Sequence, residues 1–171
     1  METNRLLIRP MKESDQNAFL DGIADQTLRI AYGFPKDMDE TIPPKIFRRF
    51  RELAGAYSLI EKTTGNMVGF LLDVDVELPE KIVGTLEGKG RTLAFAIFSP
   101  YQRKGYMEET LNAYIPHLFR DNAVTYIHCG HFTDNEPSRR LLQKIGFHEY
   151  ANHSFKERVI IDQIKQKNIR S

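Results

Sequence analysis

Cysteine is nearly absent from this sequence of 171 residues, in which Cys129 is the single example. One cysteine excludes an intramolecular disulfide and any metal site built from several thiolates, so we expect neither a disulfide nor a bound metal. Disulfides persist in oxidising compartments, and their exclusion is compatible with a reducing cytoplasm. The sequence therefore predicts a cytoplasmic protein.

Long apolar segments are missing as well. The first 15 residues lack the apolar core of a secretory signal, and no stretch approaches the roughly 18 apolar residues that suggest a membrane span. We therefore expect a soluble protein without a targeting segment.

Neither sign of charge dominates: 24 Lys and Arg residues face 23 Asp and Glu residues, which leaves a net charge of +1. A nucleic-acid backbone or an anionic membrane is held by an extended positive field, and this chain has no such field overall. We predict that neither is a partner and that any anion site is local.

Internal repeats, low-complexity segments and proline-rich linkers are also missing. With 41% hydrophobic residues, the chain can bury one sizeable core, and its length fits one domain better than two. We expect a single domain over residues 1–171, in which residues 164–171 form a loose tail. The expected assembly is a monomer or a homodimer.

The hydrophobic pattern predicts the order strand, two helices, three strands, helix, strand, helix and two strands. The strands are predicted over residues 5–10, 56–62, 67–76, 92–99 and 124–132, with a closing hairpin over residues 148–162. The helices are predicted over residues 12–26, 43–55, 106–118 and 134–147. This order indicates a mixed, mostly antiparallel α/β sheet of about seven strands with helices on both faces.

Several local details follow from turn and capping residues. Ser14 is expected to cap the first helix, and Pro116 to kink the third helix or end it early. Residues 77–91, which hold three glycines and a proline, are expected to form a loop or a weak extra strand. Residues 92–99 are apolar on both alternating faces, as in a central strand, and lead through a helix into a parallel, right-handed crossover with residues 124–132.

The junction after this central strand carries the clearest chemical signal, "SPYQRKGYMEETL". A helix that begins at the end of a strand presents unpaired N–H groups and a positive dipole end, which suit a phosphate or diphosphate. Gly105 allows close approach of the backbone, and Arg103 and Lys104 add cations. No G-x-x-x-x-G-K-[ST] motif occurs, and "GKG" at residues 88–90 is too short for a dinucleotide fingerprint, so another diphosphate-containing ligand is expected.

Four segments of the sequence resemble the GCN5-related N-acetyltransferase (GNAT) family, and within it the ribosomal-protein N-terminal acetyltransferases. They are "RLLIRPMKESD", "SLIEKTTGNMVGF", "SPYQRKGYMEETL" and "DNEPSRRLLQKIGF", which follow the family's order and cover most of the chain from residue 3 to about 150. The diphosphate motif Q/R-x-x-G-x-G/A and the later N-x-x-S…K-x-GF occur together. The resemblance implies a GNAT-like fold with a splayed central strand pair and acetyl-CoA as co-substrate.

Carried onto this sequence, the resemblance implies a set of site residues. The diphosphate of CoA would be wrapped by Gln102, Arg103, Lys104, Gly105, Tyr106 and Met107. Backbone groups of Phe95 and Ile97 would pair with the pantetheine arm in the manner of an added strand. Asn135 would hydrogen-bond the cofactor or hold the edge of the active site, and Ser138 would protonate the departing thiolate.

Three positions depart from the family's pattern. Thr92 stands where relatives often carry the glutamate that takes the proton of the amine, and Leu142 stands where many carry a tyrosine that serves the thiolate. Met107 stands where the motif prefers Gly or Ala, and would crowd the diphosphate unless its flexible side chain points away. Asp73 and Asp75 share a strand face and could act through water, although a solvated strand face explains them better.

Because the usual base is absent, a weakly basic acceptor is favoured. A lysine amine has a pKa near 10.4 and needs more help than an α-amine, with a pKa near 8. The sequence therefore predicts an acetyl-CoA-dependent N-acetyltransferase that acts on a protein N-terminal α-amine or a small-molecule amine. The amine would attack the thioester directly, without a covalent enzyme intermediate.

Other interpretations stay open at this point. A non-catalytic acyl-CoA-binding or regulatory module would keep the fold without a base. Cys129 and His131 share a strand face and could form a thiol dyad, although small buried cysteines are usually inert. Structural explanations also compete: Asn135 as a helix cap, and Glu109 as a complement to the helix dipole.

Overall fold

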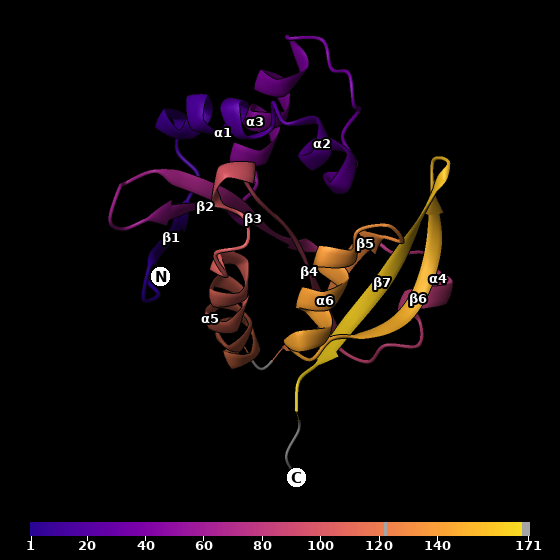
Figure 1. Cartoon of the computed structure of the whole chain (residues 1–171). Helices are drawn as coiled ribbons and strands as arrows, with labels where there is room; N and C mark the ends of the chain where they lie inside the picture. The colour runs from indigo at the N-terminus through magenta and orange to yellow at the C-terminus, as the bar shows by residue number, and fades with distance from the viewer. Residues whose placement is uncertain (122, 169–171) are drawn as a thin grey trace. The chain divides into compact units, whose positions relative to one another are not determined.

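The structure is a computed structural model that describes residues 1–121 and 123–168. Within these residues, seven strands are hydrogen-bonded in the order β1-β2-β3-β4-β5-β7-β6 (Figure 1). The strands are β1 (Leu6–Pro10), β2 (Ala56–Glu61), β3 (Met67–Asp75), β4 (Lys89–Ile97), β5 (Val124–Phe132), β6 (His148–Phe155) and β7 (Arg158–Gln166). The helices are α1 (Gln16–Gly22), α2 (Gln26–Tyr32), α3 (Ile42–Arg51), α4 (Glu80–Val83), α5 (Tyr106–Arg120) and α6 (Glu136–Lys144).

The sheet is mostly antiparallel, as predicted. The β1–β2, β2–β3, β5–β7 and β6–β7 pairs are antiparallel, and β4 and β5 are parallel. Helix α5 connects β4 to β5, so this part is the predicted crossover. The β4–β5 pairs end at Thr92↔His128 while both strands continue, as expected for a splayed central pair.

The chain divides into two compact units, each described separately here. The first consists of Met1–Asp73 and Phe95–Thr110, and the second of Val74–Ala94 and the chain from Leu111 onward. Strand β4 and helix α5 each contribute residues to both units.

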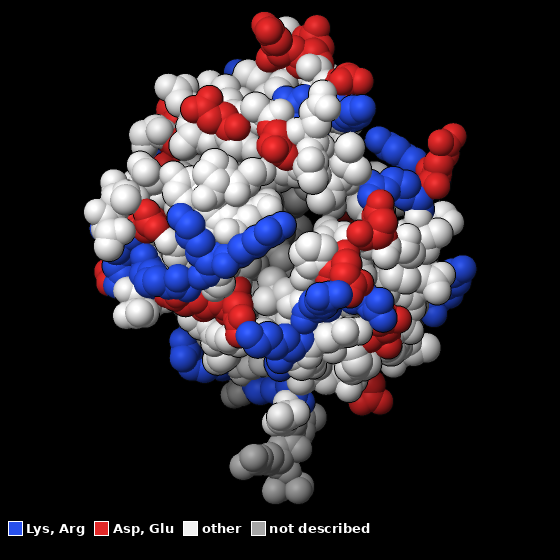
Figure 2. Space-filling model, in the orientation of Figure 1, with Lys and Arg blue, Asp and Glu red and all other residues white. Residues whose placement is uncertain are grey.

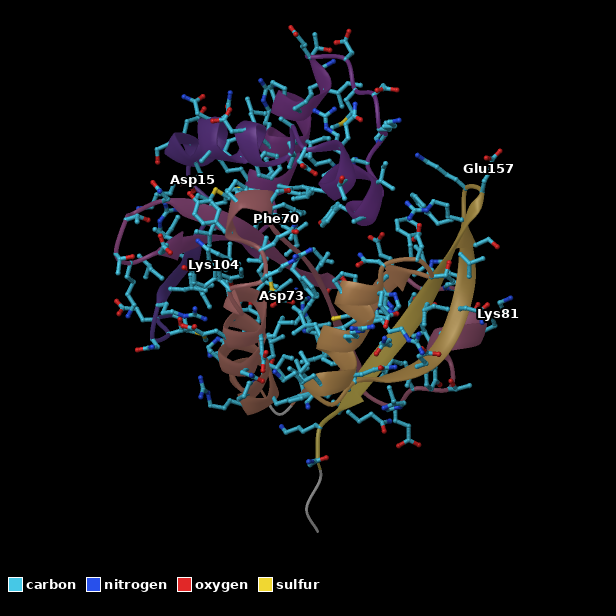
Figure 3. The ribbon with its side chains drawn as sticks, viewed as in Figure 1. Asp15, Phe70, Asp73, Lys81, Lys104 and Glu157 are labelled. Atoms are coloured by element: carbon cyan, nitrogen blue, oxygen red, sulfur yellow. The ribbon has the colours of Figure 1, made fainter. Side chains whose placement is uncertain are left out.

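The first unit is built around aromatic side chains from α1, α3 and β3. The ring centre of Phe19 lies 5.4 Å from that of Phe47 and 5.5 Å from that of Phe70, which is labelled in Figure 3. All three side chains are fully buried or nearly so, because the helical spacing of the α1 and α3 residues turns their apolar faces toward β3. Such ring pairs add to the stability that burial supplies.

An ion pair between half-buried Arg9 and buried Asp15 fixes the turn between β1 and α1. The Arg9 guanidinium donates two hydrogen bonds of 2.7 Å to Asp15, which also accepts from Ser58 Oγ at 2.7 Å and from the Lys12 N–H at 2.8 Å. Asp15 directly precedes α1, but its side chain makes no capping hydrogen bond to that helix. The expectation that Ser14 caps this helix is wrong, because Ser14 lies exposed within a 3₁₀ turn, Glu13–Asp15.

The second unit contains the β5–β7–β6 part of the sheet and α6. Ile127, Leu142 and Ile164 are buried in it, and Lys165 of β7 donates a hydrogen bond to the Ile145 carbonyl at the end of α6. Pro137 lies in the first turn of α6 and Gly146 follows it with φ of 91°, so both ends of this helix agree with the sequence pattern.

Other expectations need correction. Helix α2 was not predicted; it has seven residues and is capped by the preceding Asp25, whose carboxylate accepts from the Leu28 N–H at 2.7 Å. The segment 77–91 contains α4 and the start of β4. Helix α5 continues past Pro116, so the early end is wrong.

Two further strand expectations are only partly correct. Leu93 is the buried residue of β4, whereas the other positions are half-buried or exposed, so this central strand is not covered along both faces. Strand β7 includes residues 164–166, which were expected to be tail, and residues 169–171 lie outside the described residues. Among the described residues, none of the helices has the length and apolarity needed to cross a bilayer.

Candidate active site

The turn between β4 and α5 contains two residues in the left-handed region. Arg103 has φ of 62° and Gly105 has φ of 77°, and α5 begins at the next residue. A Cβ on Gly105 would meet only Arg5 Nη2 at 3.5 Å, so the backbone angle and not crowding requires glycine here. Left-handed residues next to right-handed ones in a turn can direct backbone N–H groups toward a common point, an arrangement that suits anions.

The start of α5 adds further backbone N–H groups at the same place. It is a helix of 15 residues whose first N–H groups have no partner within the helix, and whose dipole is positive at this end. Arg103 and Lys104 are exposed, and Lys104, labelled in Figure 3, lies 5.3 Å from the ring centre of Tyr101. Elsewhere on the face in Figure 2, basic and acidic side chains are interspersed. The turn therefore combines a helix N-terminus with two exposed cations, an arrangement that suits a negatively charged group.

Arg5, next to β1, holds the turn in place. Its Nη1 donates to the Lys104 carbonyl at 2.8 Å, its Nε donates to Glu109 Oε2 at 2.7 Å, and its guanidinium lies 4.6 Å from the ring centre of Tyr106. The Arg5 N–H and the Thr3 hydroxyl both donate to Glu109 Oε1, at 2.7 and 2.6 Å. Burial opposes ionisation of Glu109, but these hydrogen bonds hold its pKa below the ordinary value. Glu109 thus anchors the turn and does more than complement the dipole.

Two side chains of the first helical turn point away from the solvent. Tyr106 and Met107 are each 6% exposed, and the Tyr106 hydroxyl donates a short hydrogen bond to Glu61 of β2. This bond raises the pKa of Tyr106 and, with one from Thr64, lowers that of Glu61. Because Met107 is buried, its side chain points away from the solvent at this turn, which is the case in which no crowding is expected.

The end of β4 leads directly into the turn. Phe95 and Ile97 are half-buried, and the Ile97 carbonyl accepts a hydrogen bond of 2.9 Å from Gln102 Nε2. On the β3 side, the Phe98 N–H donates to the Val68 carbonyl at 2.9 Å. Gln102 therefore ties the turn to the strand that precedes it.

In the second unit, Asn135 and Ser138 lie in one turn at the start of α6. The Asn135 side-chain oxygen accepts from the Ser138 N–H at 3.2 Å, so Asn135 caps this helix. Ser138 is half-buried. Leu142 stands at the position where the family resemblance leads one to expect a tyrosine. Its side chain is 1% exposed and belongs to the core.

A chain of hydrogen bonds crosses four strands of the second unit. Thr92 Oγ1 on β4 lies 3.1 Å from His128 Nδ1 on β5, and His128 Nε2 lies 2.9 Å from Asp162 Oδ1 on β7. Asp162 Oδ2 then lies 2.7 Å from His153 Nδ1 on β6. We name these four residues the polar chain. Asp162 is fully buried, whereas the His153 side chain is 23% exposed.

The thiol dyad is excluded by the surroundings of Cys129. The thiol is buried, and burial raises its pKa far above the ordinary value. His131 uses Nδ1 on the Phe132 carbonyl at 2.8 Å and Nε2 on Gln163 Nε2 at 2.8 Å, so its ring is engaged elsewhere. Cys129 is a core residue.

The two aspartates at the end of β3 differ from each other. Asp75 is solvated, with 83% of its side chain exposed, and forms an ion pair with Arg91. Asp73 is only 8% exposed, so the expectation that it lies on a solvated strand face is wrong for this residue.

Comparison with known proteins identifies the family. The model of the acetyltransferase (GNAT) domain matches residues 5–148. The chain belongs to the GNAT acetyltransferase family. It is accordingly an acyltransferase, and the family predicted from the four sequence segments is confirmed. No curated protein sequence matches the chain.

Solved structures share the GNAT fold over nearly the whole chain. A GNAT acetyltransferase from Bacillus anthracis superposes with a TM-score of 0.79 at 16% identity, covering 97% of each chain. The ribosomal-protein-S5-alanine acetyltransferase from Vibrio fischeri gives 0.73 at 17% identity, covering 99% of this chain and 97% of its own. An acetyl transferase from Salmonella typhimurium, which modifies the N-terminal serine of a 50S ribosomal subunit protein, gives 0.75 at 15% identity, covering 97% of each.

The structure gathers residues 102–107 of this GNAT chain in one turn, and it places Asn135 and Ser138 together in another unit. Sequence reasoning missed Arg5 and the polar chain. A signal for the polar chain was present, because His128 and Asp162 are polar residues within apolar strand patterns, and buried polar groups require partners.

Proposed function

We propose that this GNAT protein transfers an acetyl group from acetyl-CoA to a primary amine, and that the turn before α5 holds the diphosphate of CoA. The observation that carries the proposal is the pair of left-handed residues, Arg103 and Gly105, at the N-terminus of a helix of 15 residues. Backbone N–H groups and a positive dipole end suit a diphosphate, and Arg103 and Lys104 supply mobile positive charge.

The remaining contacts to the cofactor follow from the elements on either side of the turn. Gln102, Tyr106 and Met107 would contribute backbone groups, because the Tyr106 and Met107 side chains are buried. Backbone groups of Phe95 and Ile97, which are half-buried residues, would pair with the amide groups of the pantetheine arm.

In the second unit, we assign Ser138 to the departing sulfur. A thiolate needs a proton or a hydrogen bond as the carbon–sulfur bond breaks, and a hydroxyl can donate either. Asn135 would fix the position of Ser138 through the cap hydrogen bond of 3.2 Å. The amine would attack the thioester carbonyl directly, so no acyl-enzyme is formed.

For the acceptor, we propose an N-terminal α-amine of a protein or peptide, as in the ribosomal-protein branch of the family. The absence of a carboxylate at Thr92 favours an amine with a pKa near 8 over a lysine. The similar proteins from Vibrio fischeri and Salmonella typhimurium are described as acting on ribosomal proteins. A small-molecule amine with comparable basicity is the second choice.

We further propose a single-domain protein that acts in the cytoplasm as a monomer or a homodimer, without metal. A lone thiol that is buried suits a reducing compartment and needs no partner there.

The competing proposal is a module that binds acyl-CoA without catalysis. Met107 no longer favours it, because the buried side chain does not crowd the turn.

Two measurements separate the proposals. Calorimetric titration should show that CoA binds at least tenfold more tightly than pantetheine, which lacks the diphosphate. Peptides with N-terminal serine or alanine, and spermidine as a small amine, should be tested for acetylation by mass spectrometry. CoA binding without acetylation of any amine would overturn the enzyme proposal, and equal binding of pantetheine would overturn the diphosphate site.

A further inference from the structure

The polar chain of Thr92, His128, Asp162 and His153 lies on one face of the sheet, with one residue on each of four neighbouring strands. We propose that Thr92 and His128 together accept the proton of the attacking amine, and that Asp162 and His153 are positioning residues for His128. This inference rests on the proposed function, for which it supplies the missing base.

The hydrogen-bond partners decide which nitrogen of His128 carries the proton. A carboxylate only accepts hydrogen bonds, so His128 Nε2, which lies 2.9 Å from Asp162 Oδ1, must be the N–H. In the neutral ring Nδ1 is then an acceptor, and the Thr92 hydroxyl donates to it at 3.1 Å. This leaves the lone pairs of Thr92 Oγ1 available to accept a proton from an amine or a bound water.

The burial of Asp162 supports a role beyond stability. The side chain is fully buried, and its partners on both oxygens are histidines, at 2.9 and 2.7 Å. Burying a carboxylate costs a large desolvation free energy, and replacing a buried ion pair by apolar residues of similar volume often leaves stability unchanged or higher. Stability alone therefore does not explain a carboxylate at this position. A carboxylate held against an imidazole stabilises the imidazolium that forms when the ring takes a proton.

The position of Thr92 fits this role. Thr92 and His128 form the last β4–β5 pair, at the point where both strands continue beyond their mutual hydrogen bonds. Thr92 is half-buried and stands three residues before Phe95 in the same strand, ahead of the backbone edge assigned to pantetheine. The His153 end of the chain reaches partly exposed surface, with 23% of the side chain accessible.

The proposed step conserves atoms and charge. As the amine nitrogen forms its bond to the acetyl carbon, it gives a proton to Thr92 Oγ1, which passes its own proton to His128 Nδ1. The carbon–sulfur bond breaks and the sulfur leaves with the bonding electrons. The proton on His128 then passes to the thiolate or to water, and Asp162 keeps its contact with His128 Nε2 throughout.

Other titratable groups share the face of His128 and must be considered in any pH profile. By strand register they are Tyr126 on β5, Asp162 on β7, and His148 and His153 on β6, while Tyr150 lies in the bulge between Glu149 and Ala151. Of these, Asp162 contacts His128 directly, and His153 contacts it through Asp162.

The test compares Thr92→Val with Thr92→Ser, using the acetylated peptide as the readout. Valine has nearly the shape of threonine but no hydroxyl, and Thr92 is only half-buried, so the fold should persist. Thr92→Val should lower kcat/KM about 100-fold, the lower range for general base catalysis, and Thr92→Ser should restore most of it. The matched control is Thr125→Val on β5, which removes a hydroxyl that donates to the Glu87 carbonyl. This variant should leave kcat/KM unchanged.

The pH profile and a double variant separate catalysis from structure. At saturating peptide, the acidic limb of kcat against pH in the wild type should change in Thr92→Val and in His128→Gln, because both interrupt the same proton path, whereas the limb of kcat/KM that reports the free α-amine should remain in every variant. The double variant should be no slower than either single variant, since residues acting as one unit are not additive. Additive losses, or an unchanged profile in Thr92→Val, would overturn the proposal.

Two controls keep this test separate from the proposed function. Circular dichroism and CoA titration report whether His128→Gln folds. If this variant does not fold, the proposal is tested by the Thr92 variants alone. A wild-type protein that binds CoA and acetylates no amine contradicts the proposed function, and with it the proposed role of Thr92 and His128. If the wild-type enzyme acetylates peptides and Thr92→Val acetylates them equally fast, only the proposed role of Thr92 and His128 is contradicted.

Discussion

Arg5 Nη1 donates a hydrogen bond of 2.8 Å to the backbone carbonyl of Lys104, so a residue next to β1 holds the turn that precedes α5. The same guanidinium binds Glu109 in the first turns of α5. The conformation of the proposed diphosphate site therefore depends on a cation that need not contact the cofactor.

Replacement of Arg5 by alanine should release this turn. Loss of the hydrogen bonds to Lys104 and Glu109 should weaken CoA binding about fivefold, or about 1 kcal/mol, a modest value because the Arg5 side chain is 41% exposed. Titration calorimetry measures the change. Arg51→Ala, which breaks the exposed pair with Glu13, is the control and should leave CoA affinity as it is. Equal CoA affinity in Arg5→Ala and wild type would show that the turn needs no anchor.

Gly105→Val should weaken CoA binding at least tenfold. A β-branched residue is strained at φ of 77°, at a cost of about 1 to 2 kcal/mol, and relief of this strain would move the turn. Gly65 provides a matched control, because it has φ of 74° in the exposed β2–β3 hairpin with nothing near its Cβ position. Gly65→Val should lose similar stability in urea unfolding yet keep its CoA affinity. The same affinity loss in both variants would mean that the effect is only general destabilisation.

Acid should weaken the β1–α1 turn through Asp15. Burial raises the pKa of this carboxyl, but hydrogen bonds from Arg9, Lys12 and Ser58 outweigh burial and place the pKa below its ordinary value. Because the folded pKa lies below the unfolded one, the stabilisation is complete above about pH 4 and disappears as the pH falls through the folded pKa. Asp15→Asn should cost about 2 kcal/mol at pH 7, less than for a fully buried pair because the Arg9 side chain is 21% exposed. In urea titrations this difference should shrink on acidification; a difference that does not change with pH would refute the assignment.

Cys129 should be inert in the folded protein. Its thiol is buried and its pKa is raised, so thiolate is scarce and access is blocked. An excess of iodoacetamide at pH 8 should leave the native chain unmodified and label one site after denaturation. Cys129→Ala should retain acetyl transfer. Rapid labelling of native protein, or loss of transfer in Cys129→Ala with the fold intact, would contradict this description.

Local patterns in the sequence predicted much of the fold. Strand β5 agrees with the prediction over residues 124–132, because its apolar run is long and bounded by polar residues. Pro137 and Gly146 mark the two ends of α6. The turn before α5 was found in the same way, since its glycine, cations and helix start are adjacent in the chain.

Features that depend on distant pairing could not be predicted. Arg5 and Glu109 are 104 residues apart, and nothing in either local pattern indicates their contact. The polar chain takes one residue from each of four strands, so it exists only once the registers between those strands are known. Helix α2 was missed because seven residues with one strong cap give little periodic signal.

The central claim is acetyl transfer from CoA bound at the turn before α5, and the most direct measurement is the stoichiometry of that reaction. Wild-type protein, acetyl-CoA and a peptide with an N-terminal serine should be incubated while free thiol and acetylated peptide are both quantified. The account predicts one thiol released for each acetylated α-amine, and at least tenfold less of both with Gly105→Val at limiting acetyl-CoA. Thiol release without acetylated amine, or equal product from Gly105→Val, would contradict it.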